Sequence, residues 1–128
     1  MASLVLVDTD ILIDAGRGIP LAVAFLARQS EEVLAVCAVT RMELIVGCRN
    51  KGELRTLDRF LRAFRVFSLT PEITQKAEDL LRQYRLSHGL LIPDALIAAT
   101  AVGAGVALAT ENLADFRFID GLQLAAYG

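Results

Sequence analysis

Cysteine and histidine are scarce in this sequence, which contains two cysteines and one histidine. Cys37 and Cys48 lack the spacing of metal ligands, so reduced, packed thiols fit them better than a disulfide or a zinc site. The one histidine, His88, stands in a predicted loop, where a single histidine is more often inert than a general acid. The sequence thus offers neither a disulfide framework nor a cluster of histidine and cysteine ligands.

Long apolar runs are absent as well. No run reaches the roughly 18 residues of a membrane-spanning helix, although 55% of the residues are hydrophobic and the mean hydropathy is +0.50. We therefore expect no membrane segment. A core rich in alanine, leucine and valine could account for part of the apolar surplus, but a self-association face or a groove for a partner chain explains it better, so we expect a homo-oligomer. The first residues also lack the basic and apolar regions of a secretory signal, which predicts a cytoplasmic protein.

The chain also lacks a net positive charge, since its formal net charge is −2 at pH 7. Any contact with nucleic acid then needs a local basic patch rather than overall attraction. The most basic stretch of the chain runs from residue 49 to residue 65. Its basic residues are Arg49, Lys51, Arg55, Arg59, Arg62 and Arg65.

What the sequence does contain is an alternation of apolar, strand-like runs with helical patterns. This alternation predicts one α/β domain over residues 1–128, with a mostly parallel sheet of four or five strands and helices on both faces in three layers. The expected strands are residues 4–7, 33–39, 66–69 and 106–109, with 122–125 as a candidate edge strand. The expected helices are 21–29 after Pro20, one opening at Thr40, 51–64, one starting at Thr70-Pro71, and 95–104, with loops at 31–32 and 87–92.

Asp8 directly follows the first expected strand. Ligands of open α/β sheets bind beyond the carboxyl ends of the strands, so Asp8 stands where chemistry is usually done. The alternative is that Asp8 or Asp10 simply caps the following helix by accepting hydrogen bonds from its free N–H groups.

Other acids follow later strands. Glu43 comes after the second strand, Asp94 opens the helix before the fourth, and Asn112 and Asp115 lie just past the fourth. Sequential strands tend to be neighbours, so these side chains can meet at one rim of the sheet. Clustered carboxylates repel one another, and Mg²⁺ or Mn²⁺ is the simplest cation that keeps an oxygen-only site ionised.

Each of these acids also has a structural explanation. Glu43 fits a capping box in which its side chain bonds back to the N–H of Thr40. Asp94 is favourable in a first helical turn, and Asp115 could be a plain loop acid. We interpret Asp10 and Asp14 as cap and surface residues.

Four segments together resemble the PIN-domain ribonucleases, specifically the VapC toxins of bacterial and archaeal toxin–antitoxin pairs. The segments are VDTDILID at 7–14, VTRMEL at 39–44, IPDALIAATA at 92–101, and LATENL at 108–113 followed by Asp115 and Phe116. The resemblance extends over nearly the whole chain, and the four segments have the order and spacing of that family. The resemblance implies the PIN fold.

The resemblance also implies site residues. By this likeness Asp8, Glu43 and Asp94 are the core metal-binding acids, and Thr9 and Thr110 are supporting polar groups. The fourth acidic position of the family falls in residues 110–116, where Asn112 and Asp115 are both candidates for facing the metal. Asp115 is also assigned with Asp8, Glu43 and Asp94 to the catalytic residues.

The activity that the resemblance implies is endonucleolytic cleavage of RNA with Mg²⁺ or Mn²⁺. It further implies a homodimer, a higher-order complex with a VapB-type antitoxin, and inhibition by that antitoxin. The chemistry of the residues agrees, because a metal at Asp8 and Asp94 would position and deprotonate a water for in-line attack on phosphorus. Glu43 could then orient that water.

The basic stretch has three interpretations under this activity. Arg49, Lys51, Arg55, Arg59 and Arg62 could follow the RNA backbone, form a solvated helix face with salt bridges, or contact the antitoxin. Phe60, Phe64 and Phe67 fit core positions better than platforms for stacked bases.

Two rival functions remain. A phosphatase of the haloacid dehalogenase class also has a strand followed by Asp-x-Asp and would use Asp8 as its nucleophile, but Lys51 and Lys76, the only lysines, do not follow a strand as that class requires. The other rival is an inactive PIN-type binding module, against which the retained acids argue.

Overall fold

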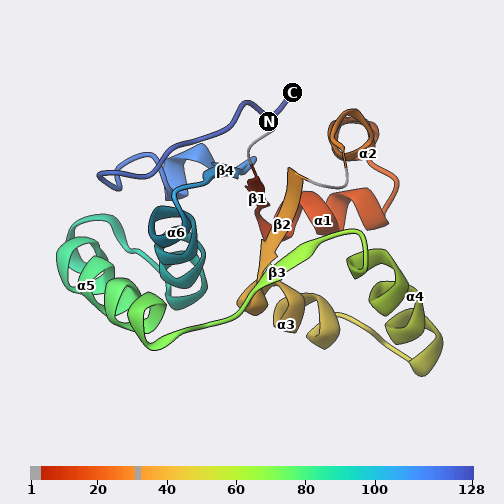
Figure 1. Ribbon diagram of the computed structural model, residues 1–128, viewed down its shortest axis with the longest axis horizontal. Coiled ribbons are helices and arrows are strands. Elements are labelled where there is room, and N and C mark those ends of the chain that lie inside the picture. The colour runs from red at the N-terminus through yellow and green to blue at the C-terminus, as the bar shows by residue number, and fades with distance from the viewer. Residues whose placement is uncertain (1–3, 31–32) are drawn as a thin grey trace.

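Four short strands form one parallel sheet, in the order β3-β2-β1-β4, within the part of the chain that the structure describes. The structure is a computed structural model that describes residues 4–30 and 33–128 (Figure 1), so the loop expected at 31–32 lies outside it. The strands are β1 (Val5–Val7), β2 (Leu34–Cys37), β3 (Arg65–Phe67) and β4 (Ala107–Ala109). The parallel sheet that the alternating pattern predicts is confirmed.

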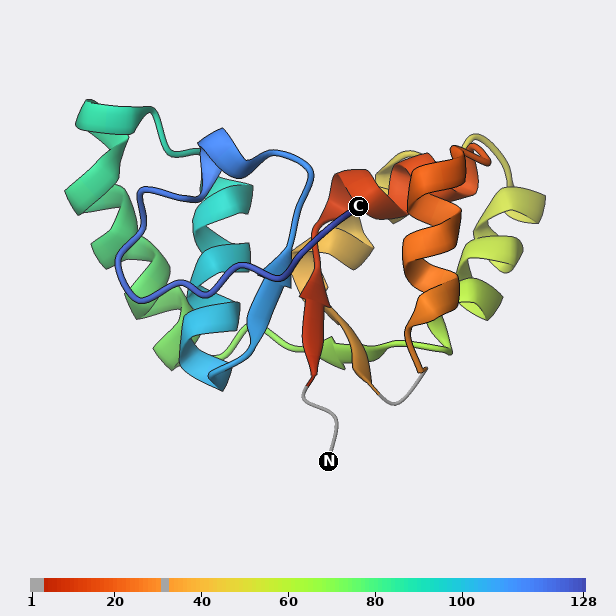
Figure 2. The same ribbon diagram turned by 90° about the horizontal axis from the view of Figure 1, so that it is seen from above.

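Six α-helices connect these strands in the described residues: α1 (Thr9–Gly16), α2 (Pro20–Arg28), α3 (Ala38–Val46), α4 (Lys51–Leu61), α5 (Pro71–His88) and α6 (Ile92–Ala104). A short 3-10 helix, η2 (Leu113–Asp115), follows β4. Helices α5 and α6 cover one face of the sheet, while α1, α2 and α4 cover the other (Figures 1 and 2). The three layers expected from the sequence are therefore present.

Side chains of the central strands alternate between the two helical layers. Leu6 packs with α5 and α6, whereas Val7 packs with α1 and α2. All four residues of β2 are buried, as expected for a parallel sheet that is covered on both faces. Because the strands are parallel, the residues that follow their carboxyl ends lie at the same edge of this buried sheet.

Turn chemistry explains where several helices begin and end. Thr70 caps α5 by accepting a hydrogen bond from the Ile73 N–H at 3.2 Å, and Pro71 follows it in the first turn. Gly89 and Gly105 end α5 and α6 in the left-handed conformation, at φ of 73° and 67°, which glycine adopts without strain.

Several boundaries differ from the sequence prediction. The observed β2 (Leu34–Cys37), β3 (Arg65–Phe67) and α6 (Ile92–Ala104) replace the expected ranges 33–39, 66–69 and 95–104. Helix α3 starts at Ala38 rather than Thr40, because the apolar run of β2 passes straight into helix. Helix α4 ends at Leu61 instead of residue 64, and α5 extends through His88, so His88 is not a loop residue. Residues 122–125 form no strand but make one isolated parallel bridge, between Leu124 and Leu108 of β4.

Candidate active site

Asp8 lies at the centre of the site, directly after β1. Its backbone is extended, its N–H donates to the Ala109 carbonyl at 2.9 Å, and the residue is 4% exposed. Oδ1 accepts a hydrogen bond from the Thr9 N–H at 2.9 Å, so Asp8 is also the N-cap of α1. The capping interpretation is therefore correct for Asp8, but a cap does not require this degree of burial.

The second carboxylate oxygen of Asp8 is held from the far end of the sequence. Thr110, buried just after β4, donates from Oγ1 to Asp8 Oδ2 at 2.8 Å. Burial raises the pKa of Asp8, and the charges of Asp10 and Glu43 add to that effect, while the bonds from Thr110 and Thr9 oppose it. Burial disfavours the ionised form of Asp8, and the hydrogen bonds from the two threonines stabilise that form.

Glu43 is held by Thr9 and not by its own helix. Thr40 lies inside the first turn of α3, whose N-cap is Cys37, so the capping box expected between Thr40 and Glu43 is wrong. The Thr9 hydroxyl donates to Glu43 Oε1 at 2.8 Å and lies 2.9 Å from the Thr40 hydroxyl. Glu43 of α3 is consequently held against the start of α1, near Asp8.

Asp94 lies in the first turn of α6 and is half-buried. Burial and the negative charges around it raise its pKa from 3.8 to about 7. The charges, in order of effect, belong to Asp8, Asp115, Glu43 and Asp10. Because water and salt screen charges that lie more than about 10 Å apart, these mutual effects indicate that acids from four separate segments lie near one another at one end of the sheet.

The acids of the candidate site lack a cationic partner among the described side chains. In residues 4–30 and 33–128, no lysine, arginine or histidine forms an ion pair with Asp8, Glu43, Asp94 or Asp115. The repulsion is therefore not relieved by any described side chain.

The two candidates for the fourth position have different surroundings. Asp115 is exposed at the end of η2, and its charge raises the pKa of Asp94. The side chain of Asn112 instead turns to α1, where Nδ2 donates to Asp10 Oδ2 at 2.6 Å. Figure 2 shows the segment after β4 reaching the start of α1 at this end of the sheet.

The sequence prediction misses part of this surrounding. Asp10 is exposed, as predicted, but the sequence does not indicate that its charge raises the pKa of both Asp8 and Asp94. The prediction also omits Glu111, which shares a hydrogen bond with Asp14, and burial together with that bond raises the pKa of Glu111. Their positions in the sequence are the signal that could have indicated both residues, because Asp10 lies three residues after the end of β1 and Glu111 directly follows Thr110.

The donor set fits a hard divalent cation, but the geometry is open. No three histidine, cysteine or acidic side chains of the described chain lie close enough together to form a ready-made metal centre. Mg²⁺ is commonly bound through one or two carboxylates and several water molecules. A buried, threonine-bonded Asp8 near a repelled Asp94 matches that mode of binding better than a closed protein cage.

The basic residues of α4 lie on the surface. Arg49, Lys51, Arg55, Arg59 and Arg62 are all exposed. Arg49 pairs with Glu53 at 2.9 Å, which matches the salt-bridge interpretation for that residue. Within the described residues, Lys51, Arg55, Arg59 and Arg62 form no ion pair and keep their charge available.

The other residues considered from the sequence lie away from the acids or in the core. The thiol of Cys37 is buried and lies 3.3 Å from the Thr100 hydroxyl, whereas the thiol of the partly buried Cys48 donates to the Leu44 carbonyl. His88 stacks on Phe118 at 4.2 Å. Phe64 is buried, whereas Phe60 is partly exposed and contacts the Phe64 ring.

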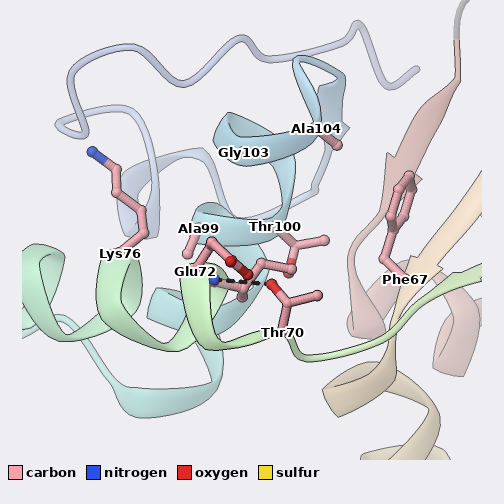
Figure 3. A pocket seen from close by; sticks show the side chains of 9 residues that line it. Phe67, Thr70, Glu72, Lys76, Ala99, Thr100, Gly103 and Ala104 are labelled. Carbon is pink, nitrogen blue, oxygen red and sulfur yellow. Dashed lines mark hydrogen bonds between the residues drawn. The ribbon is translucent and has the colours of Figure 1, made fainter.

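A cavity of about 270 Å³ lies elsewhere in the molecule, between the end of β3, the first turns of α5 and the second half of α6 (Figure 3). Its lining includes Phe67, Glu72 and Lys76 but none of the candidate acids. We place the functional site at the acids, because the chemistry there is specific and the cavity lining is mainly apolar.

Among the described residues, no helix has the length and apolar character needed to cross a membrane.

Comparison with known proteins agrees with this architecture. The family model for the PIN domain matches residues 5–121, which include every candidate acid. The chain therefore belongs to the PIN-domain family.

The relatives narrow this class to its VapC members. The chain is 38% identical to Ribonuclease VapC10 of Mycobacterium tuberculosis, over 94% of this chain and 91% of that protein. It is 30% identical to a chain in a toxin–antitoxin complex from Klebsiella pneumoniae, with a TM-score of 0.78 and coverage of 92% and 94%. A DNA-bound VapBC complex from Salmonella typhimurium contains a chain with the same fold, at 18% identity and a TM-score of 0.82, with coverage of 99% and 100%.

Proposed function

We propose that this protein is the toxin of a VapBC-type pair and an endoribonuclease that depends on Mg²⁺ or Mn²⁺. The observation that carries the proposal is the convergence of Asp8, Glu43, Asp94 and Asp115 with no cation among the described side chains. The ribonuclease name of its 38% identical relative supports RNA as the substrate.

Asp8 and Asp94 are the residues that would hold the ion. Bound there, a divalent cation would supply charge neutralisation for the phosphate and a water of lowered pKa. Asp8 is prepared for this role because Thr9 and Thr110 fix both of its oxygens and leave the remaining lone pairs free. Glu43, fixed by the Thr9 hydroxyl, orients the attacking water. Asp115 adds negative charge near Asp94 and is the better candidate for the fourth acid.

The exposed basic residues of α4 are proposed to follow the RNA backbone. Lys51, Arg55, Arg59 and Arg62 form a positive surface on a chain whose net charge is −2. Contacts of this kind bind phosphates without reading the sequence of the bases.

The proposed protein partner is a VapB-type antitoxin. A 30% identical chain occurs in a toxin–antitoxin complex, which supports an antitoxin for this chain as well. The proposal extends to inhibition, in which the antitoxin covers the acidic site.

Self-association is also part of the proposal. The outer side of α3 exposes Met42, Ile45 and Val46, and Val46 is 83% exposed. Large apolar side chains grouped on one helix favour an interface over free solvent. Sedimentation of the wild type as a dimer, and of Val46→Asp as a monomer, would support a homodimer through this face; an unchanged dimer in the variant would contradict it.

The two rival functions are not supported. Lys51 and Lys76 lie in α4 and α5, so neither occupies the strand-end position that a haloacid dehalogenase requires. An inactive binding module does not need four acids held together against their mutual repulsion.

The direct test is RNA cleavage by the purified protein, free of antitoxin. We expect cleavage with Mg²⁺ or Mn²⁺, arrest in EDTA, recovery after metal is restored, and loss of cleavage in Asp8→Asn. Undiminished cleavage in EDTA or by the variant would refute the proposed mechanism, and a phosphoryl group trapped on Asp8 would favour the phosphatase.

A further inference from the structure

The side chain of Asn112 links two segments that are far apart in the sequence. Its Nδ2 donates to Asp10 Oδ2 at 2.6 Å, so the segment after β4 is tied to the first turn of α1. A carboxylate can only accept hydrogen bonds, which fixes the amide nitrogen of Asn112 toward Asp10.

The backbone of Asn112 acts on the same site through Thr110. Its N–H donates to Thr110 Oγ1 at 3.0 Å. This bond occupies one lone pair of the Thr110 hydroxyl oxygen. The single proton of that hydroxyl points to Asp8 Oδ2, at 2.8 Å. The orientation of the donor that holds Asp8 therefore depends on the position of Asn112.

Asn112 also precedes the short helix that carries Asp115. The Asp115 N–H donates to the Asn112 carbonyl at 3.0 Å, which begins the turn of η2. A displacement of Asn112 would thus move Asp115, whose charge raises the pKa of Asp94.

From these contacts we infer that Asn112 is a positioning residue, which clasps the 110–116 segment onto α1 through Asp10 and so sets the arrangement of Asp8 and Asp115. The inference rests on the proposed function for its effect on catalysis. It also explains why the segment has an amide and not a carboxylate at this point, since an aspartate at 112 would meet Asp10 at hydrogen-bonding distance and repel it.

A charge-preserving exchange tests the clasp. Asn112→Ala removes the bond, and Asn112→Asp replaces it with repulsion between two carboxylates. The double variant Asp10→Asn/Asn112→Asp restores an amide–carboxylate bond with donor and acceptor reversed and with the same net charge. Gln75→Ala is the matched control, because it deletes another amide–carboxylate bond, from Gln75 Nε2 to Asp79 Oδ1 at 3.0 Å on α5.

Two measurements follow the function of the site: the Mn²⁺ dissociation constant, from the electron paramagnetic resonance signal of free Mn²⁺, and the kcat of RNA cleavage. Both single variants are expected to lose roughly 10- to 100-fold in Mn²⁺ affinity or kcat, as is typical when outer partners of a metal site are removed. The double variant is expected to recover most of that loss, and the Gln75 control to lose nothing. If Asn112→Asp binds Mn²⁺ and cleaves as well as the wild type, the clasp is wrong.

A third measurement does not depend on the proposed function. Hydrogen–deuterium exchange of the peptide covering residues 110–116, in metal-free protein, is expected to accelerate in both single variants and to slow again in the double variant. Equal exchange in the wild type and Asn112→Ala overturns the clasp. A wild type that neither cleaves RNA nor binds Mn²⁺ overturns the proposed function instead, and the exchange data still decide whether Asn112 fixes this segment.

Discussion

The hydroxyl of Thr110 donates a hydrogen bond of 2.8 Å to Oδ2 of Asp8, although 102 residues separate the two in the sequence. The bond follows from the sheet, because β1 and β4 are parallel neighbours and both end at this rim. It gives the buried carboxylate a donor that stabilises its ionised form.

Thr110→Val keeps the shape of this side chain and removes the donor. We expect the Mn²⁺ affinity to fall about 10-fold, because the carboxylate loses a partner that orients it and favours its charge. Thr110→Ser, which retains the hydroxyl, should bind Mn²⁺ nearly as well as the wild type. Equal affinities for the valine and serine variants, measured by titration, would show that the hydroxyl has no role.

The stability of the metal-free protein should depend on Asp94. Its pKa is raised to about 7 in the folded state, so the folded protein binds a proton more readily than the unfolded chain does. The contribution of Asp94 to stability is then greatest at low pH and is lost as the pH rises toward and through 7.

Asp94→Asn mimics the protonated acid and should remove this dependence. We expect the variant to melt a few degrees above the wild type at pH 8 in EDTA, with a smaller difference at pH 5. Thermal melts of both proteins at the two pH values measure this effect. A variant that is less stable than the wild type at pH 8 would contradict the mutual repulsion of the acids.

Thr70 should contribute to stability and not to activity. Thr70→Ala removes the side-chain cap of α5, and the loss of an N-cap costs about 1 kcal/mol. Urea denaturation measures the free energy of unfolding, and Thr74→Ala, within the same helix, is the control for helix propensity. Loss of RNA cleavage in folded Thr70→Ala would place this region in the site, against our account.

The basic surface of α4 should act through charge alone. In an Asp94→Asn background, which we expect not to cleave, Arg55→Ala/Arg59→Ala should weaken RNA binding. The slope of log affinity against log salt should become shallower by about 0.7 for each phosphate of a single strand that the variant no longer neutralises. Lys76→Ala, on α5, is the control. A salt slope unchanged by the double variant would assign these residues to a solvated face or to the antitoxin.

The fold and the converging acids can be predicted from the sequence because both depend on local patterns. The apolar runs ending at Asp8 and before Thr110 predict strands, and their parallel order places the following residues at one rim. Thr70-Pro71 and Pro93-Asp94 predict two helix starts, and α5 and α6 confirm both.

The bonds between the acids and their partners depend on tertiary structure and could not be predicted in the same way. Thr40 and Glu43 have the spacing of a capping box, but the N-cap of α3 is Cys37, three residues earlier than the cap pattern suggests. Glu43 consequently bonds to Thr9, 34 residues away, and Asn112 bonds to Asp10 across 102 residues. Local sequence patterns cannot predict hydrogen bonds between side chains so far apart in the sequence.

The most direct test of the central claim is the initial rate of RNA cleavage as Mn²⁺ is added back to metal-stripped protein. We predict saturable activation of the wild type and of Asp79→Asn, an exposed acid on α5, and no activation of Asp94→Asn at any Mn²⁺ concentration. Mn²⁺-dependent cleavage by Asp94→Asn at the wild-type rate would show that the acids at this rim do not form the active site.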